Sequence, residues 1–124
     1  MAEKLNWSYA VQAEGGPLIA GAGALEVDAY VKLSVTIPAG ETKEVEILPA
    51  PGGALQLLVI AAAKPSADLS YELDGNAVPL DGPHVLIGPG AVALCAGAIG
   101  TLAFTNDTSE EARIDILAGR DATP

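Results

Sequence analysis

The chain has 124 residues, of which half are hydrophobic, and a formal net charge of −10 at pH 7. This charge opposes binding to nucleic acid and to anionic membranes, because the six Lys and Arg residues are scattered and form no basic stripe. The length predicts one domain spanning residues 1–124, large enough to hide about two-thirds of its unfolded surface. Because very few residues are aromatic, Ala, Val, Leu and Ile must fill the core.

The first 26 residues are predicted to be peripheral. Leu5 to Gln12 alternates weakly and indicates a first strand, with Trp7 either covering the core or anchoring an interface. Gly15 to Ala24 is rich in small residues and is predicted to be a loop. The N-terminus shows no secretory signal pattern, and no apolar run reaches the 18 residues that a membrane span requires.

A hairpin is predicted next. In Val27 to Ile37, Val31 and the other odd-numbered residues from 29 face the core, while Tyr30 and the even-numbered residues face outward. After a turn at residues 38–41, Thr42 to Leu48 resumes the alternation, with Val45 and Ile47 inward and Glu44 and Glu46 outward.

Leu55 to Ala63 is apolar on both period-2 faces, so a strand here must be covered on two sides. Its three final alanines also fit a buried helix, but the flanking Pro and Gly residues and the β-branched Val59 and Ile60 favour a strand. In a chain of this length, the second cover is either another part of the chain or another subunit. Ala91 to Ala96 is a second run that is apolar on both faces.

Further short segments are separated by turns that are rich in Gly, Asp, Asn and Pro. They are Asp68–Asp74, Ala77–Leu80, His84–Ile87, Thr101–Thr105 and Ala112–Leu117. Eight or nine short strands with no convincing helix predict an all-β fold, an antiparallel β-sandwich of jelly-roll type.

No motif for catalysis is present. His84 is the only histidine, which argues against a metal centre of the cupin type, and it is predicted to be an ordinary strand residue. Cys95 is the only cysteine and lies in an apolar run, as a small buried hydrophobe would. We therefore expect no catalytic residue, no metal and no cofactor.

The segment from Leu102 to Asn106, followed by Ala112 to Asp121, resembles the closing hairpin of small bacteriophage structural proteins. The resemblance covers about the last 20 residues. It implies a virion component, such as a capsid decoration or tail-associated protein, that is commonly trimeric and works through its surfaces. Its implied partners are further copies of itself and a protein lattice such as a capsid. The implied location is the virion, or the cytoplasm if the protein is not viral.

Two functional hypotheses follow. The first is a structural protein that self-associates, with candidate interface residues Trp7, Leu18, Ile19, Tyr30 and Leu94. The second is a small ligand-binding module of carbohydrate-binding type, which would use the aromatic residues Trp7, Tyr30 and Tyr71 on strands.

Overall fold

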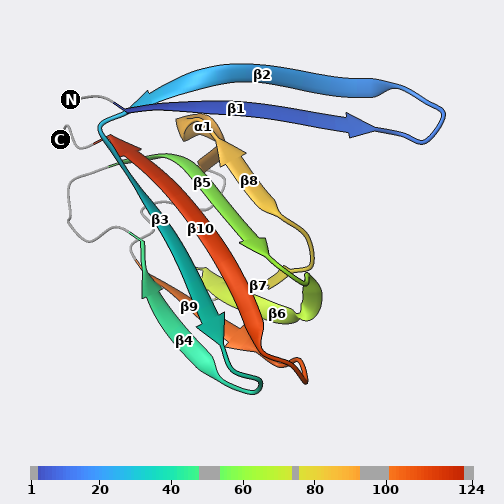
Figure 1. The fold of residues 1–124 in the computed structure, drawn as a ribbon, viewed down its shortest axis with the longest axis vertical. Helices are drawn as coiled ribbons and strands as arrows, with labels where there is room; N and C mark the ends of the chain where they lie inside the picture. Colours follow the sequence, from blue (N-terminus) through green and yellow to red (C-terminus); the bar gives the residue numbers. More distant parts are fainter. Residues whose placement is uncertain (1–2, 48–53, 74–75, 93–100, 122–124) are drawn as a thin grey trace.

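The computed structural model describes residues 3–47, 54–73, 76–92 and 101–121, and all statements below refer to them. These ranges form ten strands and one helix of four residues. Strands β1 (Glu3–Gln12) and β2 (Leu18–Val27) pair along their whole length as an antiparallel hairpin, which we call the arm. Figure 1 shows the arm lying across one end of a two-layered body and extending past it.

The body consists of two antiparallel sheets of four strands each. Sheet I has the order β3-β10-β5-β8, and sheet II has the order β4-β9-β6-β7. The strands of sheet I are β3 (Ala29–Ile37), β5 (Ala54–Ala62), β8 (His84–Ile87) and β10 (Ala112–Asp121). Those of sheet II are β4 (Thr42–Glu46), β6 (Ser66–Leu73), β7 (Asn76–Leu80) and β9 (Thr101–Asn106). Except between β6 and β7, each successive strand changes sheet, and this order is that of an eight-stranded jelly roll.

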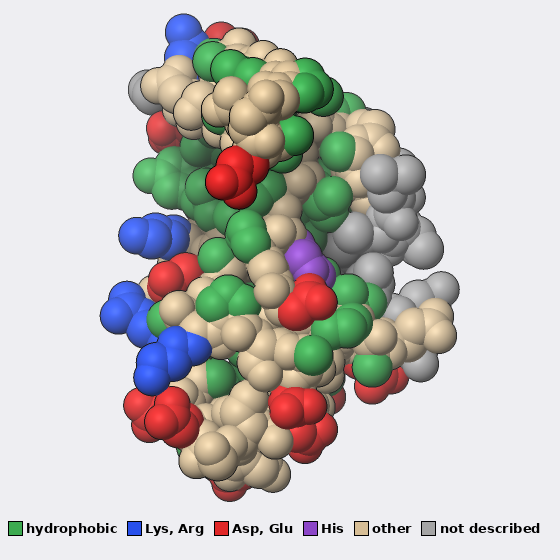
Figure 2. Space-filling model, turned by 90° about the vertical axis from the view of Figure 1, so that its right-hand side faces the viewer, with side chains coloured by type: hydrophobic (Ala, Val, Ile, Leu, Met, Phe, Trp, Pro, Cys, Tyr) green, Lys and Arg blue, Asp and Glu red, His purple; other side chains and the backbone are tan. Residues whose placement is uncertain are grey.

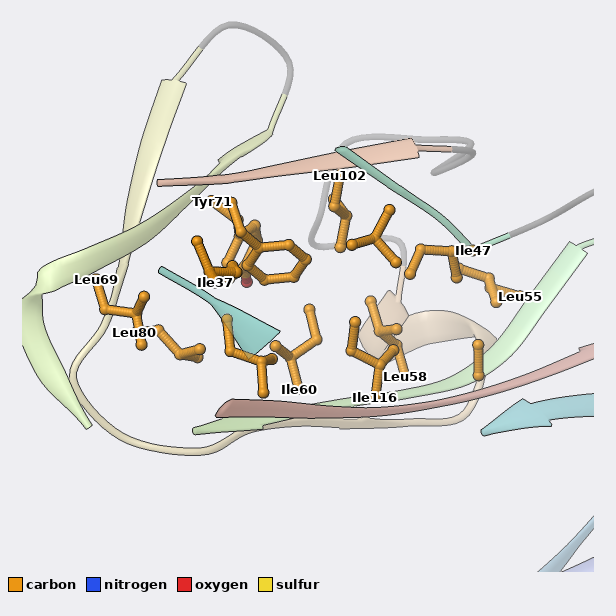
Figure 3. Close-up of a cluster of buried hydrophobic side chains, with 14 of the residues drawn as sticks. Ile37, Ile47, Leu55, Leu58, Ile60, Leu69, Tyr71, Leu80, Leu102 and Ile116 are labelled. Carbon is orange, nitrogen blue, oxygen red and sulfur yellow. The ribbon is translucent and has the colours of Figure 1, made fainter. Parts of the chain in front are cut away.

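The core lies between the two sheets and is built from aliphatic side chains around a few rings. Ile60 and Ile116 from sheet I meet Leu102 and Phe104 from sheet II, as Figure 3 shows in part, and all four are at most 2% exposed. Phe104 packs against Tyr71, with ring centroids 5.6 Å apart. The sequence prediction of an all-β antiparallel sandwich is confirmed.

Strand β5 corresponds to the predicted central strand. Leu58 and Ile60 point into the core, so a strand rather than a buried helix forms here. Leu57 points to the opposite face of sheet I and is also buried, at 4% exposed, whereas its outward neighbour Val59 is only half-buried. The outer face of β5 is therefore covered only in part, fully at Leu57 but not at Val59.

The predicted hairpin between the segments at 27–37 and 42–48 is wrong. β3 pairs with β10 in sheet I, and β4 pairs with β9 in sheet II, so the connection crosses from one layer to the other. Alternation reveals which side chains point inward but does not identify the pairing partner. The prediction of which side chains face the core is correct, since Ile37, Val45 and Ile47 are all buried.

Three further expectations need correction or remain open. The predicted loop at Gly15 to Ala24 is largely strand, because β2 starts at Leu18. The run at Ala91 to Ala96 begins in a helical turn, α1 (Pro89–Val92), and its remainder lies outside the described residues. The described residues form ten strands, against the predicted eight or nine, and β2 is the strand that was read as a loop.

Candidate interaction surface

The arm has one apolar face and one face of small and polar residues. Cross-strand partners share a face, so the register places the pairs Leu5–Leu25, Trp7–Gly23, Tyr9–Gly21 and Val11–Ile19 together. We call this set the apolar arm face. Its outer part is open to solvent: Tyr9 is 45% exposed, Val11 69% and Ile19 67%.

Two glycines explain why the aromatic residues lie flat on this face. A Cβ atom at Gly23 would lie 2.7 Å from Trp7 Cζ2, and one at Gly21 would lie 2.9 Å from Tyr9 Cε1. The rings therefore occupy the space that the missing side chains leave, an arrangement known to stabilise glycine-containing strands. Trp7 and Tyr9 also stack on each other, with centroids 6.0 Å apart and planes inclined by 14°.

The base of the arm is fixed to the outer face of sheet I. A Cβ atom at Gly119 in β10 would lie 2.8 Å from Leu5 Cδ1 and 3.2 Å from Val27 Cγ1, so the arm approaches the backbone closely there. The amide of Asp28 also donates a hydrogen bond of 2.9 Å to the carbonyl of Arg120. These contacts bury Leu57 beneath the base of the arm.

Beyond this contact, the outer face of sheet I carries more apolar side chains. The register aligns Val85, Val59 and Leu117 across β8, β5 and β10, and places Ile87 beside Leu57. We call Val59, Val85, Ile87 and Leu117 the body patch. Val85 is 50% exposed and the other three are half-buried. Figure 2 shows hydrophobic side chains on the arm at the top of the view and more of them on the body directly beneath it.

The charges are distributed unevenly over this surface. Between Lys4 and Glu26 the only charged residue is Glu14, which lies in the turn at the tip of the arm. On the outer face of sheet I, Lys32 is the β3 neighbour of Leu117 and makes no ion pair with the described residues. Farther along the same face, Asp115 accepts a hydrogen bond of 2.5 Å from Ser34 and lies 3.7 Å from Arg113.

The predicted interface residues occupy different places. Trp7 and Ile19 lie on the apolar arm face, whereas Leu18, 56% exposed, lies on the opposite face next to the tip. Tyr30, 49% exposed, lies on the outer face of sheet I beside Gly119. Leu94 lies outside the described residues.

Sequence reasoning did not single out Tyr9, Val11 and Val85 as surface residues of interest. The alternation of the first strand places Trp7, Tyr9 and Val11 on one side. Because β2 was read as a loop, there was no reason to expect that this strand forms a hairpin that extends away from the body. The segment His84 to Ile87 is too short for its alternation to show which side faces water, so the exposure of Val85 could not be predicted from it.

Other polar groups form contacts elsewhere on the body, whereas the Nε atom of Arg120 is buried and has no hydrogen-bond partner among the described residues. His84 Nδ1 lies 2.6 Å from the hydroxyl of Tyr71, a hydrogen bond that joins sheet I to sheet II. A hollow between the loops at 63–66 and 108–113 is bridged by an ion pair of 3.2 Å between Lys64 and Glu110, both largely exposed, and no aromatic residue lines it. Over the described ranges, no group of three or more His, Cys, Asp or Glu side chains is arranged to hold a metal ion.

Comparisons with known proteins return no match: no family model, no curated protein and no solved structure matches this chain. In the part of the chain that the structure describes, no helix has the length and apolar character needed to cross a membrane.

Proposed function

We propose that this protein is a non-enzymatic structural protein that self-associates, as a homotrimer, and attaches to a larger protein lattice as a virion component of capsid decoration or tail-associated type. The observation that carries the proposal is the apolar arm face, which the fold leaves exposed. Monomeric soluble proteins rarely expose large contiguous apolar patches, and such patches mark interaction sites. Here the large hydrophobic side chains of Tyr9, Val11 and Ile19 are exposed together on the arm, and Val85 is exposed on the body.

The fold supports this proposal only at the level of architecture. Jelly rolls occur in viral capsid proteins, in lectins and in cupins, and a shared fold does not imply a shared function. A cupin centre would need several metal ligands, and His84 is the only histidine in the chain. The C-terminal segment whose sequence resembles the closing hairpin of phage structural proteins forms β9 and β10, which lie in different sheets and do not pair with each other, so the predicted hairpin is wrong. The resemblance, which is one of sequence alone, favours the capsid-associated role among these possibilities.

The ligand-binding alternative receives less support from the geometry. Of the three aromatic residues on which it rests, Tyr71 is 4% exposed and belongs to the core. Trp7 lies flat over Gly23, so one face of its ring is covered. Only Tyr30 remains as an exposed ring on the body.

The proposal is tested by light scattering at low and high salt, followed by co-sedimentation with capsids assembled from any capsid protein that the neighbouring genes are found to encode. Apolar subunit contacts should give the same oligomer at both salt concentrations. Attachment of this acidic chain to a basic lattice should weaken as salt increases. A glycan array that responds, combined with a monomer at every concentration, would overturn the proposal in favour of the ligand-binding module.

A further inference from the structure

We draw no further inference here: the strongest candidate, the exposed outer part of the apolar arm face at Tyr9, Val11 and Ile19, carries nothing further, because nothing in the structure shows what covers it.

Discussion

Asn106 is a polar residue buried in the core, and replacing it should destabilise the fold severely. The residue is 0% exposed. Its Nδ2 donates to the carbonyls of Ile37 at 2.9 Å and Glu110 at 2.8 Å, while its Oδ1 accepts from the amide and hydroxyl of Thr108 at 3.0 and 2.6 Å. The amide thereby joins the end of β3 to the loop between β9 and β10.

The four hydrogen bonds set the expected magnitude. At about 1 kcal/mol each, their loss in Asn106→Ala should lower the free energy of unfolding by about 3 to 4 kcal/mol, since some groups regain water in the adjacent loop. This is a large part of the roughly 5–15 kcal/mol that stabilises a domain. Urea unfolding followed by far-UV circular dichroism measures the change, with the m-value expected to stay constant.

A matched control and a second variant sharpen this test. Asn6→Ala removes the same side chain from an exposed position on the arm and should stay within about 0.5 kcal/mol of the wild type. Thr108→Val should cost less in the Asn106→Ala background than alone, because the two side chains share hydrogen bonds. A loss below about 1 kcal/mol for Asn106→Ala would refute the assigned role.

Three other predictions concern the core and the arm. Phe104→Ala should cost about 3–5 kcal/mol in urea unfolding because the ring is fully buried, whereas Tyr71→Phe should cost only about 1 kcal/mol, the worth of its hydrogen bond to His84. Leu58→Asp should prevent folding, as judged by circular dichroism, whereas Val59→Asp on the outer face should leave a folded protein. Gly23→Ala should speed amide hydrogen exchange in the arm alone, because the new Cβ displaces the ring of Trp7.

Each of these has its own control. Gly82→Ala introduces a Cβ that meets nothing within 4 Å and should leave exchange in the arm unchanged. Glu46→Ala, on an exposed position of β4, should melt with the wild type. If Leu58→Asp and Val59→Asp lost the same stability, the assignment of the two faces of β5 would be wrong.

The inward and outward orientation of side chains was predictable because each strand of the body packs one face into the core between the two sheets. Leu69 and Tyr71 in β6 are buried as their alternation predicts, and Val45 and Ile47 are buried around β4. The strand pairing was not predictable in the same way. A strand that continues into a hairpin and one that crosses to the other sheet show the same alternation, so β3 and β4 were joined incorrectly.

The arm was the least predictable part. The segment around Gly21 and Gly23 is poor in strand-forming residues, and it forms a strand through full-length pairing with β1, whose Tyr9 and Trp7 rings cover the two glycines. The candidate interaction surface was consequently found in part: Trp7 and Ile19 were anticipated, but the body patch depends on the register of β5, β8 and β10, which no local pattern reveals.

The position of the single tryptophan has a practical consequence for spectroscopy. Trp7 lies in the arm, whereas most of the strand residues, which dominate far-UV circular dichroism, lie in the body. Tryptophan emission therefore reports on the arm, and circular dichroism reports mainly on the body. Coincident unfolding curves, the usual test of two-state behaviour, would here show that the arm separates from sheet I only when the jelly roll itself unfolds. An earlier transition in emission would instead identify the arm as an independent cooperative unit, held to the body by the contacts of Leu5 and Val27 at Gly119 and by the hydrogen bond from Asp28 to Arg120.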